Sequence, residues 1–99
     1  MNLRGAIDPL LLILVSLAGG TKHGHAILLD VESFAGVRMG PGTLYGAITR
    51  LEEDGLIEAL PAEGRRRPYR LTSSGQDVLV TRLAVLGGTV RTALERVAT

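Results

Sequence analysis

Three consecutive arginines, Arg65, Arg66 and Arg67, form the densest group of side chains in this chain that could bind a charged partner. They lie in residues 61–70, which read PAEGRRRPYR and carry four arginines against one glutamate. Adjacent guanidinium groups repel one another unless an anion lies against them, and the planar guanidinium fork binds phosphate in two places at once. The cluster therefore predicts contact with a polyanion, with a solvated turn as the simpler alternative.

Two histidines, His23 and His25, stand two residues apart and could begin a metal site. The spacing offers no obvious third ligand, and histidines often serve as helix caps or core residues instead. The sequence contains no cysteine, which excludes disulfides, a thiol nucleophile and cysteine-containing metal sites. No serine, histidine and acid have a recognisable catalytic spacing, and no glycine-rich phosphate loop follows a strand. We therefore predict that the protein is not an enzyme and that it has neither a metal nor a cofactor.

A short helix just before the arginine cluster is predicted to present a polar face. Its apolar residues Leu44, Ile48 and Leu51 recur at i, i+4 and i+7, and Gly55 ends it. The face opposite these residues is therefore polar and points outward. Because helix amino termini also favour phosphate, we predict that this face contacts bases or phosphates. For Tyr45, a half-buried position with its hydroxyl on a neighbouring backbone group is an equal alternative. The predicted DNA contacts on this helix are Gly42, Thr43, Tyr45, Gly46, Thr49 and Arg50.

Two short strands flank the arginine cluster. Residues 56–60 and 69–71 read as strands, with Pro61 and Gly64 in the turn between them. Helix, strand, basic turn and strand in this order describe a winged helix, in which the helix enters a DNA groove and the turn follows the backbone. The predicted contacts outside the helix are Lys22, His23, Arg65, Arg66, Arg67 and Tyr69.

Two earlier helices are expected to support this module. Asp8 and Pro9 cap a helix over about residues 9–18 that is apolar nearly all the way round, so a second subunit is a candidate for part of its cover. A second helix begins near residues 21–23 and runs to about Ser33. Residues 37–39 are expected to form a short strand that pairs with the wing.

A long last helix begins at Thr72 or Ser73, because Ser73 and Gln76 fit a capping box and Thr72 is an equally good cap. Its apolar residues recur in steps of three and four, close to a heptad seam, and it is too long for its own domain to cover. Gly87 and Gly88 should weaken or kink it by about 1 kcal/mol each. Packing on the first helix of the same subunit is the alternative to a homodimer. The predicted interface residues are Leu11, Leu14, Val15, Leu79, Leu83, Leu86, Val90, Leu94 and Val97.

The composition suits one domain with a localised basic surface. The chain has 99 residues, 45% of them hydrophobic, and a net charge of only +1. Residues 1–60 hold four basic and seven acidic side chains, whereas residues 61–99 hold seven and three. The longest apolar run falls short of the roughly 18 residues that a membrane span needs. We expect a cytoplasmic protein that is mainly α with a small β-hairpin: a winged helix over residues 1–72 and a dimerisation helix over residues 73–99.

These motifs resemble the PadR-like transcriptional regulators over nearly the whole chain. His23 and Gly24 match the histidine–glycine pair of the family's second helix, and residues 42–45 match its G-T-L-Y motif. Residues 51–57 match L-E-x-x-G-L-I, and residues 69–75 match Y-x-L-T-x-x-G. The single long helix that follows resembles the short subfamily. Its members are dimers joined through the first and last helices, and they often bind aromatic or drug-like effectors near that interface.

The resemblance implies a regulator with three partners: double-stranded DNA, a second copy of the chain and a small hydrophobic effector. We expect a repressor on an inverted-repeat operator, with half-sites about one helical turn, ~34 Å, apart. The chain departs from the family in two ways. His25 replaces the family's usual aromatic residue, so no contact of that ring carries over, and the chain has no tryptophan, so stacking of a flat effector between indole rings does not carry over. The alternatives are an adaptor module that binds only protein and a metal-sensing regulator that uses His23 and His25.

Overall fold

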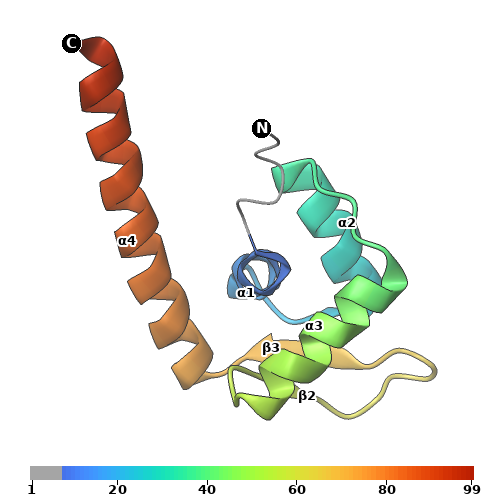
Figure 1. Cartoon of the computed structure of the whole chain (residues 1–99). Coiled ribbons are helices and arrows are strands. Elements are labelled where there is room, and N and C mark those ends of the chain that lie inside the picture. The colour runs from blue at the N-terminus through green and yellow to red at the C-terminus, as the bar shows by residue number, and fades with distance from the viewer. Residues whose placement is uncertain (1–7) are drawn as a thin grey trace.

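The computed structural model describes residues 8–99, and residues 1–7 of the predicted 1–72 domain lie outside this range. Three helices and a small sheet form a body, and a fourth helix leaves it as a long arm (Figure 1). The mainly helical winged-helix architecture is therefore confirmed. The elements are α1 (Pro9–Ala18), β1 (Lys22–His23), α2 (Gly24–Ala35), α3 (Pro41–Glu53), β2 (Ile57–Ala59), β3 (Pro68–Leu71) and α4 (Ser73–Ala98).

Helix α1 lies at the centre of the body, with the other helices around it in Figure 1. It begins as predicted, because the Asp8 carboxylate accepts a hydrogen bond from the backbone N–H of Leu10 at 2.8 Å and Pro9 occupies the first turn. It contacts α2, α3, β3 and α4. Most of its apolar surface is therefore covered within one subunit, and its all-round apolar character does not require a second one.

Helix α2 begins at Gly24, just after the predicted start at residues 21–23, and runs to Ala35, two residues past the predicted end. Its C-cap is Gly36, whose φ of 65° is in the left-handed region. Residues 36–40 then form a loop in which Met39 is buried. The strand expected at residues 37–39 is wrong. The segment that pairs with the wing is β1, which runs antiparallel to β3 with Lys22 opposite Tyr69. Since β2 occupies the other edge of β3, only one edge was open, and the residues that lead into α2 take it.

Helix α3 matches its prediction closely. Gly40 is the N-cap, Pro41 is the first helical residue, and Leu44, Ile48 and Leu51 are each 1% exposed. These three side chains pack into the core, so the opposite side of the helix faces outward. Gly55, with a φ of 72°, turns the chain into β2.

The wing is a hairpin of β2 and β3 that extends past the regular strands. Glu63 and Arg66 exchange two backbone hydrogen bonds, with N–H to O distances of 2.7 and 3.1 Å. The tip is therefore Gly64 and Arg65, and Gly64 has a φ of 65°, which glycine adopts without strain. This tight turn presents the arginine cluster on its outer end.

Helix α4 is capped by Thr72, whose hydroxyl oxygen accepts a hydrogen bond from the backbone N–H of Gly75 at 3.0 Å. Of the two caps that the sequence offered, Thr72 is confirmed, and the capping box of Ser73 and Gln76 is wrong because Ser73 is already helical. Gly75 lies so close to the Leu56 carbonyl that an added Cβ would be 1.9 Å from the oxygen. This contact fixes where α4 leaves the body.

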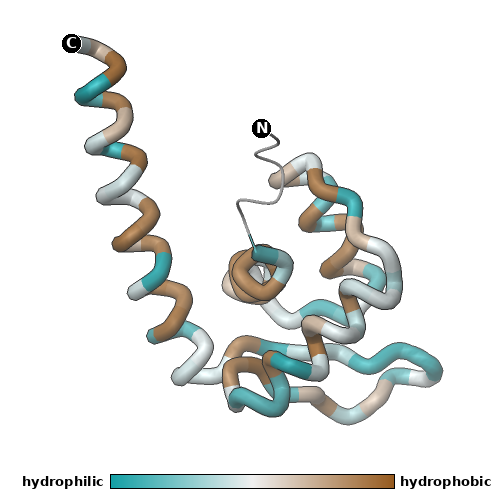
Figure 2. The backbone as a smooth tube through the Cα atoms, viewed as in Figure 1, coloured by the Kyte–Doolittle hydropathy of each residue, from teal (hydrophilic) through white to brown (hydrophobic). Residues whose placement is uncertain are grey.

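The rest of α4 projects from the body without a break at Gly87 and Gly88. Figure 2 shows hydrophobic segments along its whole length, whereas the outer end of the wing is mainly hydrophilic. Leu79 is its last side chain in the core. The buried apolar core consists of Leu11, Leu12, Ile13, Leu14, Leu17, Ile27, Val31, Met39, Leu44, Ile48, Leu51, Ile57, Tyr69 and Leu79.

Candidate nucleic-acid interface

A hollow of about 210 Å³ lies where the start of α2, the first turns of α3 and the wing meet. We call it the wing hollow. Apart from Gly24 and His25, all the residues that line it are predicted DNA contacts. None of these lining residues carries a carboxylate. The fold therefore gathers hydrogen-bond donors and positive charge from segments more than 40 residues apart in sequence. The lining residues are His23, Gly24, His25, Tyr45, Arg65, Arg66, Arg67 and Tyr69.

Tyr45 reaches the wing hollow because Gly24 has no side chain. A Cβ built on Gly24 would lie 2.6 Å from the Tyr45 hydroxyl oxygen and 3.0 Å from two ring carbons. The ring therefore packs directly over the first residue of α2, while half of Tyr45 stays exposed. Only the histidine–glycine pair in the sequence pointed to Gly24, and it did not reveal this contact.

His23 joins α2 to the wing. Its Nδ1 accepts a hydrogen bond from the backbone N–H of Ala26 at 3.3 Å, which makes it the N-cap of α2. Its Nε2 lies 3.4 Å from Nη1 of Arg66, on the wing. Nδ1 of this ring thus caps α2, and Nε2 lies at the wing hollow.

The other wing side chains have different surroundings. Arg67 Nη1 donates a hydrogen bond to the Leu60 carbonyl at 3.1 Å, which ties this arginine to its own hairpin. Tyr69 is only 8% exposed and forms a wall of the hollow. Burial raises the pKa of Tyr69, Glu52 and Tyr45 raise it further, and Arg67 opposes the rise. The Tyr69 hydroxyl therefore keeps its proton at neutral pH.

The outward face of α3 is open. Thr43, Gly46 and Thr49 are exposed, and a Cβ built on Gly46 meets no heavy atom of the described chain within 4 Å. The Thr49 hydroxyl donates to the Tyr45 carbonyl at 2.9 Å. Arg50 pairs with Asp54 at 3.3 Å, but both side chains are about half exposed or more, so the pair adds little stability. The guanidinium of Arg50 can leave this pair for another partner.

Lys22 is not among the residues that line the wing hollow. Its ammonium nitrogen donates to the Ser16 carbonyl at 2.6 Å and lies 3.9 Å from the Asp30 carboxylate. The Ser16 hydroxyl, which is buried, donates to the same carboxylate at 2.7 Å. This network joins the end of α1 to β1 and α2. The structure therefore gives Lys22 bonds within the chain, and its predicted DNA contact stays a prediction.

Eight of the nine predicted interface residues divide into two groups. Leu11, Leu14 and Leu79 are at most 4% exposed and pack in the core of the single chain. The predicted residues that follow Leu79 on α4 are between 40% and 85% exposed, and they form what we call the α4 stripe. The α4 stripe consists of Leu83, Leu86, Val90, Leu94 and Val97.

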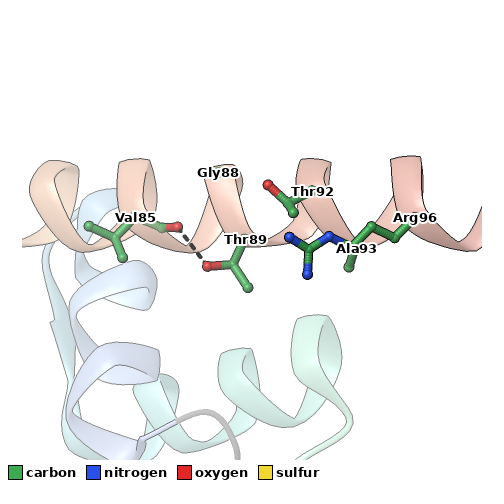
Figure 3. A pocket seen from close by; sticks show the side chains of 6 residues that line it. All are labelled: Val85, Gly88, Thr89, Thr92, Ala93 and Arg96. Atoms are coloured by element: carbon green, nitrogen blue, oxygen red, sulfur yellow. Dashed lines mark hydrogen bonds between the residues drawn. The ribbon is translucent and has the colours of Figure 1, made fainter.

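An apolar groove of about 920 Å³ lies between α1, the end of α2 and α4. Val15, the remaining predicted interface residue, is among its lining residues, together with Phe34, Leu83 and Leu86. We call it the α1–α4 groove. A second hollow, of about 600 Å³, is formed by α4 alone, and Figure 3 shows that its side chains all come from this one helix. With no second wall, it is part of the helix surface.

The structure gives little support for a metal sensor. His23 uses Nδ1 in the α2 cap, and residues 8–99 contain no group of three or more metal-ligating side chains. Within the same range, no helix has the length and apolar character to cross a membrane.

A winged helix with an open α3 face, a basic hollow beside the wing and a projecting terminal helix has the architecture of a transcriptional regulator. The profile of the Transcriptional regulator PadR-like family matches residues 13–81. The chain belongs to this family, which confirms the resemblance seen in the motifs. The family and its named members are regulators, so the expectation that the protein is not an enzyme is also confirmed.

Individual proteins agree with this assignment. The transcriptional regulator Rv3488 of Mycobacterium tuberculosis is 43% identical, and the match covers 82% of this chain and 85% of that protein. An uncharacterised 37.1 kDa protein in transposon TN4556 of Streptomyces fradiae is 46% identical over 73% of this chain, which spans only 21% of that protein's length. The crystal structure of a PadR family regulator from Clostridium difficile has the same fold, with a TM-score of 0.78 and 22% identity over 92% of this chain and 98% of that one.

Proposed function

We propose that this regulator represses transcription as a homodimer that binds an inverted-repeat DNA site, with α3 in the major groove and the wing along the adjacent backbone. The observation that carries the proposal is the wing hollow. It joins three arginines to Tyr45, the residue that also belongs to α3. When α3 lies in the groove of a duplex, the DNA backbone beside that groove therefore lies against the wing.

The charge and hydrogen-bonding capacity of this surface suit a phosphate backbone. Three guanidinium groups stand on or beside the wing hollow, whose lining set contains no carboxylate. The N-cap of α3 is Gly40, which has no side chain to bond the first-turn amides, so these N–H groups remain open to an acceptor. Thr43 and the exposed glycines beside it let a helix approach closely.

The apolar surface of α4 supports the homodimer. The α4 stripe continues past Leu79, where the subunit's own core ends. A second copy supplies an apolar helix of the same kind, and the α1–α4 groove offers it a place to pack. Two-fold symmetry then sets two α3 helices about one helical turn, ~34 Å, apart on the cytoplasmic DNA.

A small hydrophobic effector would act through the same elements. The α1–α4 groove is lined mainly by apolar side chains and touches both helices that would join the subunits. A ligand changes DNA affinity only if it binds the free and the DNA-bound dimer with different affinities. Calorimetry with aromatic compounds, showing equal affinity for both forms, would remove this part of the proposal.

The direct test is to select duplexes from a random-sequence pool and to measure their binding to variants. The wild-type protein should enrich inverted repeats. Replacing Arg65, Arg66 and Arg67 by alanine should weaken binding and lower the slope of log K against log salt by about 0.9 for each lost phosphate contact. The matched control replaces Arg82, Arg91 and Arg96 on α4, which removes the same charge away from the wing.

If both triple variants lose affinity equally, the effect is net charge, and the wing does not contact DNA. If the wild-type protein enriches no duplex, the adaptor alternative replaces the regulator proposed above.

A further inference from the structure

We propose that His23 and Arg66 together hold a single backbone phosphate in the wing hollow, and that the capping of α2 keeps the His23 ring in the tautomer that can donate to it. This phosphate site presupposes the DNA binding proposed above. It specifies which group fills the hollow and which residue, beyond the arginines, recognises it.

The ring of His23 cannot satisfy both of its neighbours. Nδ1 accepts from the backbone N–H of Ala26 at 3.3 Å, so Nδ1 carries no proton. A neutral imidazole must then carry its proton on Nε2. Nε2 lies 3.4 Å from Arg66 Nη1, which is also a donor. Two donors therefore face each other without an acceptor.

The opposite tautomer would satisfy Arg66 at the expense of the helix. With the proton on Nδ1, the backbone N–H of Ala26 would lose its acceptor in a partly buried position. A backbone amide in a helix cannot turn elsewhere, whereas the exposed guanidinium of Arg66 can bond to water. The cap therefore determines the tautomer, and Nε2–H remains as a donor that points toward the wing.

An anionic oxygen resolves this conflict, because it can accept from Nε2–H and from the guanidinium at once. The other walls of the hollow favour the same ligand. Tyr45 is held over Gly24 with its hydroxyl in the hollow, and Tyr69 is a protonated phenol. His25 and the arginines on either side of Arg66 supply further donors.

The occupant is a phosphate of duplex DNA and not a free anion, because the hollow is continuous with the proposed groove-reading helix. Tyr45 belongs to α3 and also lines the hollow. When α3 lies in the major groove, the strand that borders the groove passes the wing. A phosphate of that strand is the acceptor that His23 and Arg66 lack.

The first test needs no DNA. Long-range proton–nitrogen NMR spectra of the histidine rings at pH 8 report which nitrogen carries the proton. We expect His23 as the Nε2–H tautomer, with the Nδ1–H signature absent. An Nδ1–H ring would overturn the proposal, since its Nε2 would accept from Arg66 and could not donate to phosphate.

The second test is a double-mutant cycle on a duplex selected by the wild-type protein. His23→Ser keeps a capping oxygen for α2 but removes the ring donor. His23→Ser and Arg66→Ala should each weaken binding about tenfold, the size of one hydrogen bond to a charged group. The double variant should bind about as weakly as the weaker single variant. Additive losses would show that the two residues serve different groups.

The third test locates the phosphate. Duplexes that carry one uncharged methylphosphonate at successive positions should reveal one position that weakens wild-type binding. At that position the His23→Ser and Arg66→Ala variants should lose nothing further. Arg50→Ala, on α3 and outside the set of residues that line the wing hollow, is the control and should still lose affinity there. If His23→Ser and Arg66→Ala respond to different positions, the shared phosphate does not exist.

The fold of the variants has its own check. His23→Ser should unfold at nearly the wild-type temperature, whereas His23→Ala, which removes the cap, should unfold earlier. If the wild-type protein enriches no duplex from the random pool, the proposed function is wrong. If the protein binds DNA but the two substitutions cause additive losses in the cycle, only the proposal of a shared phosphate is wrong.

Discussion

Replacing Gly46 with alanine separates the stability of α3 from its fit to DNA. Gly46 is exposed in the interior of the helix, and a Cβ built there has no heavy atom of the described chain within 4 Å. Alanine at an exposed helix position is favoured over glycine by about 0.8–1 kcal/mol. The free variant should therefore be more stable than the wild type. For a domain of this size its unfolding temperature should rise by about 4–8 °C for each kcal/mol.

The same methyl group should weaken DNA binding. If the α3 face lies against base edges, a Cβ at Gly46 occupies space that the duplex fills in the complex. Moving the helix outward to relieve this contact lengthens its hydrogen bonds, and we expect a loss of about tenfold, or about 1.4 kcal/mol. Gly46→Leu should lose more, because its side chain is larger while the free protein still has room for it.

The assays are thermal unfolding followed by circular dichroism and fluorescence anisotropy with a selected duplex. Gly87→Ala is the matched control, since Gly87 is also an exposed helical glycine with open space around its Cβ, but it lies on α4. It should raise stability to a similar extent and leave DNA affinity per dimer unchanged. If Gly46→Leu binds the duplex as tightly as the wild type, α3 is not the helix that enters the groove.

Three further changes test the packing, the titration and the assembly of the fold. Gly75→Ala should destabilise the protein by about 3 kcal/mol in urea unfolding, because its Cβ would meet the Leu56 carbonyl oxygen at 1.9 Å. Burial raises the pKa of Tyr69 above 10.0, so the unfolded chain ionises first. The contribution of Tyr69 to the free energy of unfolding should therefore stay constant below about pH 10 and fall as the pH rises further. Val90→Lys with Leu94→Lys, at side chains that are 56% and 65% exposed, should give a folded monomer in sedimentation experiments.

Each of these outcomes has a control. Gly87→Ala, in the same helix as Gly75, should stabilise the protein, and equal effects of the two changes would contradict the close contact with Leu56. Tyr69→Phe should lessen the loss of stability at high pH, and an unchanged pH profile would assign that loss to another group. Thr92→Lys lies on the opposite side of α4 from the stripe and should leave the assembly intact. A double lysine variant that remains dimeric would show that the α4 stripe is not the interface.

Several elements were predictable because neighbouring residues determine them. The spacing of Leu44, Ile48 and Leu51 gives α3 one apolar face, and this pattern needs no knowledge of the rest of the chain. The glycine at position 64 and the proline at 61 mark the wing turn in the same way. The helix ends at Pro9 and Gly55 follow local capping rules, and the structure has them within a residue or two.

The strand β1 was not predictable from local pattern. It has only two residues, Lys22 and His23, and it exists because β3 had a free edge beside the start of α2. The side chain of Lys22 was assigned to DNA because it precedes the helix, but its ammonium meets the end of α1 in the fold. Nothing in the order of residues places Ser16 and Asp30 around it.

Periodicity marks which residues are apolar and gives no information about what they pack against. Leu79 and Val90 belong to the same repeating series on α4, yet the first is 4% exposed and the second 56%. The difference is the distance of each from the body, which depends on the exit of α4 beside Leu56. The same holds for α1, whose apolar surface is covered mainly by its own subunit.

Local spacing of apolar, glycine and proline residues was thus sufficient for the helices, the wing and the family motifs, because backbone preference and amphipathic pattern act over a few residues. The wing hollow required the folded chain. His23, Tyr45 and Arg66 come from three separate elements, and their approach depends on a missing Cβ at Gly24 and a single open strand edge. Such contacts are set by steric fit between distant segments, which short-range sequence patterns do not encode.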